Sequence, residues 1–208
     1  MKSLLTLTFA LFFSASAFAV NSDSGIDHHS GTNTATEWNI DGAHSAVNFS
    51  IRHFFTPVPG VFKNWSGKLY FDPENLEGSK IDVTIDVSSV NTQNNRRDDH
   101  LRDPDFFEVD TWPNMTFKSS SIRQTGENEF VASGELTIRD TTKEIELPFK
   151  LLGVMENPMR ENTLVAGFEA STTLSRLDYG VGSGSFAQTA VIGEQVTIDI
   201  FLEVTREI

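Results

Sequence analysis

One pattern limits the possible folds of this chain more than any other: apolar and polar residues alternate strictly along several segments. Residues 80–87, with the sequence KIDVTIDV, show it most clearly. Successive side chains of a strand point to opposite faces, so the isoleucines and valines fall on one face and the charged residues on the other. The segment therefore predicts a strand with one apolar and one solvated face.

The alternation recurs in seven further segments separated by turn or loop residues. They are residues 46–53, 64–71, 115–117, 130–138, 145–151, 164–172 and 196–204. Eight antiparallel strands with one apolar face each must stack as two sheets or close into a barrel. Long strands joined mostly in sequence favour closure, so we predict an all-β, eight-stranded antiparallel up-and-down barrel of the lipocalin-like kind.

Individual residues add detail to the barrel. Pro148 should place its strand at an edge or bulge, because proline cannot donate to a ladder. An eight-stranded barrel is wide enough to be filled by side chains or to hold one small ligand. Small residues at predicted inward positions indicate room inside; they are Gly67, Ala132, Gly134, Ala166 and Ala170.

A polar segment between the third and fourth strands, residues 91–104, predicts a short helical insert. Asn94 can cap its start, Asp98 and Arg102 lie four residues apart, and Pro104 ends the helix after Asp103. A helix this polar cannot form part of a core.

Three apolar residues in and after this helix, Leu101, Phe106 and Phe107, are the candidates to attach it across the mouth of the barrel as a lid. A surface connector without function is the alternative.

Composition excludes several function classes. The formal net charge is -13, from 29 acidic and 16 basic residues, and no run of Lys and Arg occurs. Such a surface repels phosphate backbones, so we expect no nucleic-acid partner. Cysteine is absent, which excludes disulfides, thiolate catalysis and cysteine-based zinc sites.

The first residues have the pattern of an export signal. Residues 1–19 combine Lys2, an apolar run from 4 to 13 and a small-x-small cleavage pattern at 17–19, which predicts a cleaved signal peptide and a periplasmic protein. Residues 20–36 lack periodicity and are predicted to be a disordered leader. His28 and His29 in that leader could contact a metal weakly, but an unstructured tail is the simpler interpretation.

Residues typical of catalysis are scattered. No phosphate-binding loop or nucleophile motif occurs, and the histidines lack metal-ligand spacing, so we predict no catalytic residues, no metal site and no cofactor. His53 is expected at the core or rim of the barrel. Arg176 and Asp178 are expected to form a structural ion pair at a barrel end.

Several separated motifs resemble the YceI-like family in the same order. They are W38-N-I-D41 with H44-S, R97-D-x-H-L-R102 followed by D105-F-F107, W112-P-x-M-x-F-x-S119, R176-x-D-Y-G180 and I192-G-x-x-V196. Tyr179 stands where Phe or Trp is commoner. The resemblance covers residues 37–208.

The resemblance implies a lipocalin-like barrel that holds a long isoprenoid chain, such as a quinone or polyprenyl tail. The family supplies no catalytic set to transfer. Alternating parity in the strands then gives the candidate ligand-contacting residues: Val47, Phe49, Ile51, Leu69, Phe71, Ile81, Val83, Ile85, Met115, Phe117, Leu136 and Phe168.

Two other functions stay open at this point. A barrel enzyme acting on an apolar substrate would have His53 or Arg176 facing the ligand, and a fully packed barrel could serve as a protein-interaction module. We expect no membrane-spanning barrel, because the outward residues are charged or polar. A homodimer is compatible with the sequence.

Overall fold

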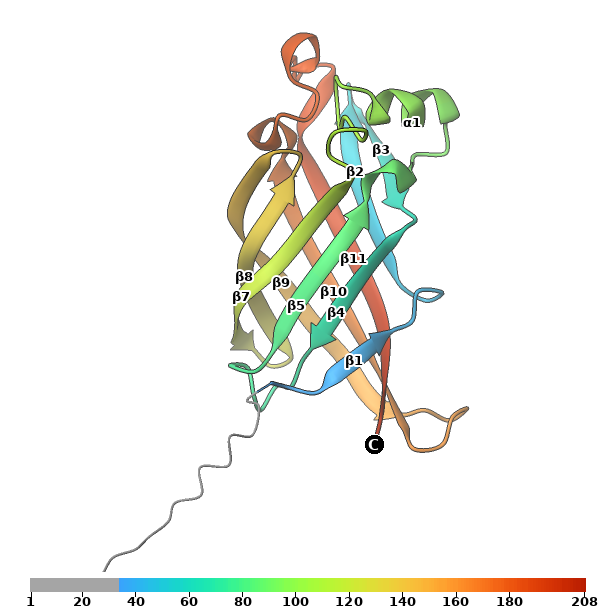
Figure 1. Ribbon diagram of the computed structural model, residues 1–208, viewed down its shortest axis with the longest axis vertical. Helices are drawn as coiled ribbons and strands as arrows, with labels where there is room; N and C mark the ends of the chain where they lie inside the picture. Colours follow the sequence, from blue (N-terminus) through green and yellow to red (C-terminus); the bar gives the residue numbers. More distant parts are fainter. Residues whose placement is uncertain (1–33) are drawn as a thin grey trace, which may run out of the picture. The chain divides into compact units, whose positions relative to one another are not determined.

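Consecutive long strands pair with one another around a closed ring in the computed structural model, which describes residues 34–208 (Figure 1). The pairing of the first strand with the last closes an eight-stranded antiparallel barrel, which confirms the predicted fold. The ring runs in the order β1 (Glu37–Ile40), β4 (Trp65–Tyr70), β5 (Lys80–Asp86), β7 (Asn114–Gly126), β8 (Glu129–Ile138), β9 (Thr141–Glu156), β10 (Thr163–Ser175) and β11 (Ile192–Glu207).

Three further strands extend the sheet beside β11. They are β2 (Ala46–His53), β3 (Thr56–Phe62) and β6 (Val90–Asn91). β2 pairs with the first part of β11, from Ile192 to Phe201; β3 pairs with β2, and β6 pairs with β3. Residues 46–53, predicted as one of the eight barrel strands, thus form β2 beside the ring, and the short strand β1 takes the place in the ring. Neither β1 nor β6 was predicted, and β3 was not predicted because Pro57, Pro59 and Gly60 interrupt any alternation. A Cβ added at Gly60 would lie 2.2 Å from Cζ of Phe49, so any larger residue would displace the Phe49 ring.

The predicted helical insert is α1 (Asn95–Arg102), between β5 and β7. Its N-cap is Asn94, whose side chain accepts a hydrogen bond from the backbone N–H of Arg97. Asp98 and Arg102, although four residues apart on the helix, have other partners. Asp98 is buried and accepts from the backbone N–H of Thr92 at 2.7 Å, whereas Arg102 pairs with Asp99 at 3.0 Å.

Short 3₁₀ helices complete the described chain: η1 (Val87–Ser89), η2 (Arg176–Tyr179) and η3 (Gly184–Phe186). No helix within residues 34–208 has the length and apolar content needed to cross a membrane. The predicted signal peptide and histidines 28 and 29 lie outside the described residues. Ala35 and Thr36, assigned to the leader by sequence, bond through their backbones to Gly78 and Phe71.

One end of the barrel is filled by phenylalanine rings. Phe71 is at its centre, with ring centroids 5.1 Å from Phe130, 5.6 Å from Phe149 and 5.3 Å from Phe168. The edge-on arrangement of these rings suits their quadrupoles. Trp38 helps to fix this cluster by donating its indole N–H to the Phe71 carbonyl at 2.9 Å.

The small inward residues do not make the room that the sequence analysis assigned to them. Ala132 and Ala166 are fully buried within the phenylalanine cluster, where the large neighbouring rings use the space. Gly134 faces backbone, with an added Cβ only 2.3 Å from the carbonyl oxygen of Lys118. Of the five small residues, Ala170 alone lines the cavity described below.

Pro148 occupies a position in β9 where one neighbouring strand is no longer paired. The ladder between β9 and β10 ends at the pair Phe149 and Ala170, so Pro148 pairs with Val131 of β8 alone. A proline is tolerated where the ladder is one-sided. The predicted edge is therefore local to Pro148, because β9 as a whole lies between β8 and β10 and is not an edge strand.

Candidate functional site

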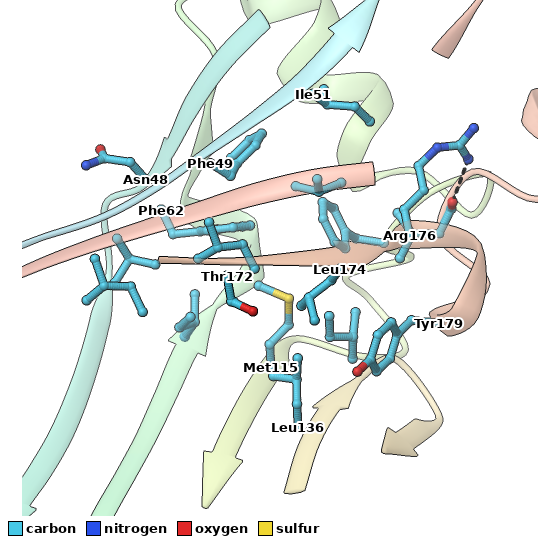
Figure 2. Close-up of a pocket in the computed structure, with 18 of the residues that line it drawn as sticks. Asn48, Phe49, Ile51, Phe62, Met115, Leu136, Thr172, Leu174, Arg176 and Tyr179 are labelled. Carbon is cyan, nitrogen blue, oxygen red and sulfur yellow. Dashed lines mark hydrogen bonds between the residues drawn. The ribbon is translucent and has the colours of Figure 1, made fainter. Parts of the chain in front are cut away.

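Above the phenylalanine cluster the barrel contains a cavity of about 960 Å³ (Figure 2). Its size is within the range of small-molecule sites, and its walls are mostly hydrocarbon. Figure 2 shows Phe62, Met115 and Leu174 approaching one another from different strands, with a hydroxyl from Thr172 among them. The interior can therefore accept an apolar molecule but offers few polar partners.

Eleven of the twelve side chains selected by parity line this cavity. They are Val47, Phe49, Ile51, Leu69, Ile81, Val83, Ile85, Met115, Phe117, Leu136 and Phe168. Phe71 is the exception and lies in the filled end, 2% exposed. Strand parity also predicts inward side chains for Ile200 and Leu202, which line the cavity but were not selected. Phe62 lines it as well, but parity could not identify it because β3 lacks alternation.

Helix α1 and the segment after it contribute side chains to the mouth of the cavity. Leu101, Phe106 and Phe107 all line it, and Phe106 packs with Tyr179 and Val181 from the loop after β10. Burial raises the pKa of the Tyr179 hydroxyl, and the charge of Asp178 adds to the effect. The three residues predicted to form a lid thus pack against a second loop.

Arg139, which the sequence analysis did not select, joins these two covering segments. Its guanidinium donates to the carbonyl of Phe106 at 2.9 Å and to that of Gly180 at 2.6 Å. It also pairs with Glu108 at 3.0 Å. The cover is therefore held by polar contacts as well as by aromatic packing.

His100 of α1 lies between two phenylalanine rings at the mouth. Its ring centroid is 4.9 Å from that of Phe106 and 5.0 Å from that of Phe186, and its Nε2 lies 3.6 Å from a carboxylate oxygen of Asp105. His100 thus connects α1 to η3, in the loop that follows β10. His53, by contrast, is exposed at the rim and packs edge-on against Phe54.

Arg176 is 5% exposed, and its guanidinium is fully occupied by backbone. Its five N–H donors reach five carbonyl oxygens of residues 181–193, at 2.5 to 3.1 Å. Burial lowers its pKa. The predicted ion pair with Asp178 is wrong, since Asp178 pairs with Lys143 at 3.0 Å. Arg176 therefore organises the loop and has no donor left for a ligand.

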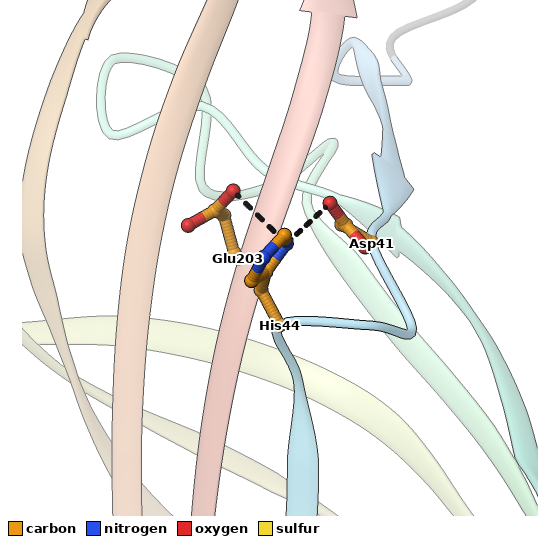
Figure 3. A group of neighbouring side chains, drawn as sticks. All are labelled: Asp41, His44 and Glu203. Atoms are coloured by element: carbon orange, nitrogen blue, oxygen red, sulfur yellow. Dashed lines mark hydrogen bonds and ion pairs between the residues drawn. The ribbon is translucent and has the colours of Figure 1, made fainter.

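A separate polar cluster lies among residues that do not line the cavity. Figure 3 shows His44 between Asp41 and Glu203, with His44 Nδ1 2.9 Å from Asp41 Oδ2 and 3.8 Å from Glu203 Oε1. The hydrogen bond to Asp41 raises the pKa of His44, and the same bond lowers that of Asp41.

Potential ligand atoms of these three residues lie within 4.8 Å of one another, so the cluster could hold a cation. The D-x-x-H spacing at 41–44 was a signal for the first two, but nothing in the sequence brings Glu203 to them. The geometry is equally that of an ordinary exposed ion pair that joins the turn after β1 to β11.

Comparisons with known proteins place this architecture among described families. The YceI-like domain family matches residues 38–204. Protein YceI of Escherichia coli O6:H1 is 35% identical over 181 residues, covering 86% of this chain and 87% of that protein.

Two solved structures share the barrel. BcnA of Burkholderia cenocepacia superposes with a TM-score of 0.71 at 26% identity, covering 79% of this chain and 99% of that one. A polyisoprenoid binding domain from Saccharophagus degradans, implicated in plant cell wall breakdown, superposes with a TM-score of 0.61 at 17% identity, covering 82% and 98%. At that identity the second likeness shows the fold alone.

Proposed function

The chain belongs to the YceI-like family, and on this basis we propose that it is an exported carrier that holds a long isoprenoid-type lipid inside its barrel. The observation that carries the proposal is the apolar cavity of about 960 Å³. A quinone or polyprenyl tail is the ligand class that best matches a long hydrocarbon interior. The polyisoprenoid binding domain of the same fold supports this choice.

The volume sets the expected affinity. At roughly 30 Å³ for each water-sized group, the cavity holds about 30 heavy atoms of a chain. Drug-sized ligands gain about 0.3 kcal/mol per heavy atom, so such a chain gains about 9 kcal/mol, a dissociation constant below about 1 μM. Apolar contact alone is sufficient for this, in keeping with the saturated guanidinium of Arg176.

The alternatives fit the observations less well. An interaction module with a packed barrel requires a filled interior, whereas only one end of this barrel is filled. An enzyme requires at least two polar groups converging in one pocket. Of its two candidate residues, His53 is exposed at the rim and Arg176 is saturated by carbonyls. Binding without catalysis is the proposal that remains.

Mass spectrometry of organic extracts from natively purified protein tests the binding proposal. We expect one or more isoprenoid lipids at close to one molecule per chain, absent from extracts of an unrelated barrel purified in parallel. Extracts that contain no apolar chain above that background contradict it.

Export is a proposal that rests on Lys2, the apolar run and the Ala17-Phe18-Ala19 pattern. The intact mass of protein from the periplasmic fraction is expected to correspond to a chain that begins at Val20. An uncleaved product in the cytoplasm would contradict export without affecting the binding proposal.

A further inference from the structure

The tip of the β2–β3 hairpin exposes two adjacent aromatic rings. Phe54 is 53% exposed and Phe55 is 90% exposed, in the turn between the two strands. Arg52, His53 and Val58, on either side of the turn, line the cavity. The exposed rings are therefore attached directly to the mouth of the cavity.

The tip is bonded to the loop that follows β10. The backbone N–H of Phe54 donates to the carbonyl of Val191 at 2.8 Å, and His53 pairs with Ile192. We call the surface formed by residues 52–59 and 183–191 the rim face; Figure 1 shows both segments at the same end of the barrel as α1. Residues 187–190 of this loop are also exposed.

The rim face differs in charge from the rest of the protein. Residues 42–71 and 179–193 contain no Asp or Glu, although the chain has 29 acidic residues among 208. Arg52 adds positive charge to the rim face itself. A protein of net charge -13 can approach an anionic surface only through a region from which acidic residues are missing.

Exposed apolar residues at the other end of the barrel offer a comparison. The turn between β9 and β10 lies at the opposite end of the barrel from the rim face (Figure 1), and Met159 in this turn is 93% exposed. Glu156 and Glu161 flank it closely in the chain. Apolar exposure thus occurs at both ends, but among residues 34–208 only the rim face carries it on segments without Asp or Glu that border the cavity mouth. Asp99 and Asp103, in and just after α1, also line the cavity, together with Arg96 and Arg97.

We propose that the rim face docks on a phospholipid bilayer, with Phe55 and Phe54 inserted between the headgroups. Aromatic rings are favoured at membrane interfaces, and an apolar tip beside positive charge is suited to an anionic lipid surface. The consequence for ligand exchange rests on the proposed function. A chain lipid could pass from the bilayer into the mouth of the cavity without crossing water.

Flotation with vesicles of phosphatidylethanolamine and phosphatidylglycerol tests docking without any cavity ligand. The wild-type full chain should float with the vesicles. Phe55→Ser should weaken partitioning about tenfold, the loss expected when one buried aromatic side chain is removed. Met159→Ser is the matched control, because it removes an equally exposed apolar side chain from the opposite end, and it should leave flotation unchanged.

A charge variant tests the electrostatic part independently. Gln188→Glu introduces a carboxylate on the rim face with almost no change in shape, and one charge at an anionic surface is worth about 1 kcal/mol, or about fivefold. The effect should shrink at high salt. Circular dichroism melts check that each variant is folded.

Failure of wild-type protein to float, or equal flotation of the Phe55→Ser and Met159→Ser variants, overturns the proposal. So does a soluble protein partner that Phe55→Ser releases while flotation is unaffected. Lipid found in extracts of a protein that does not float would retain the carrier function and reject the docking face alone.

Discussion

Filling the cavity from one strand of its wall separates binding in the interior from binding elsewhere. Val83 of β5 lines the cavity and is paired with Gly67 of β4 and Phe117 of β7. An added Cβ on Gly67 would lie 3.2 Å from Cγ2 of Val83, so the wall beside Val83 is tightly packed. In Val83→Trp the indole must therefore project into the cavity.

The size of the effect follows from the atoms displaced. Tryptophan has about seven more side-chain heavy atoms than valine, and a ligand that gives up as many atoms loses about 2 kcal/mol at 0.3 kcal/mol each. This weakens binding about thirtyfold. Stability should change little, because the ring enters open space, whereas the same substitution in a packed interior costs about 1–3 kcal/mol.

Two measurements on the same preparation check this reasoning. The lipid recovered in organic extracts should fall strongly in Val83→Trp, and urea unfolding should give a free energy close to that of the wild type. Thr84→Trp is the control, because residue 84 is the neighbour in sequence whose side chain points to the outer face. Equal lipid content in both folded variants would refute binding in the interior.

Three further predictions concern the cover, the buried arginine and the exposed ion pair. Replacing Phe106 and Phe107 with Ser should speed lipid release in a competition assay. The free energy of unfolding should fall by less than the roughly 3–5 kcal/mol of a core Phe→Ala change. A loss of that full size with unchanged lipid release would contradict a lid. Arg176→Met should lower the free energy of unfolding by about 3–5 kcal/mol, because five buried carbonyls lose their donor. It should also expose residues 180–193 to limited proteolysis. A variant with the same stability and the same cleavage pattern as the wild type would contradict this role of Arg176. Because the pKa of His44 is raised, its contribution to stability is complete below its ordinary pKa of 6.5 and is lost as the pH rises through the raised value. Because the pKa of Asp41 is lowered, its contribution to stability is complete above its ordinary pKa of 3.8 and is lost as the pH falls through the lowered value. Urea midpoints measured across pH should show both dependences, and His44→Asn should abolish the first; an unchanged profile in that variant would contradict the assignment.

Alternation in the sequence predicted which side chains face the barrel interior, but not how far along the barrel axis the cavity extends. Parity placed Val83 and Ile85 on the inner face, because the period of a strand is two. It placed Phe71 there equally well. Parity carries no information on height along the barrel axis, so it could not tell a cavity-lining residue from one in the filled end.

The covering segments show a second limit. Arg176 was expected to pair with Asp178 because opposite charges lie two residues apart, yet its partners are carbonyls of a loop 5 to 17 residues further on. Carbonyls are present at every residue, and the sequence does not mark which of them a loop will present. The same holds for Arg139, whose role depends on the meeting of two separate loops.

The phenylalanine cluster around Phe71 makes the barrel a dead end for any linear molecule. Nothing can be threaded in at one end and drawn out at the other. An amphiphile whose tail leads must stop with its head at the mouth, where a receiver would meet that head first. Under the proposed function, release of such a molecule would reverse its loading, and its orientation would be kept throughout.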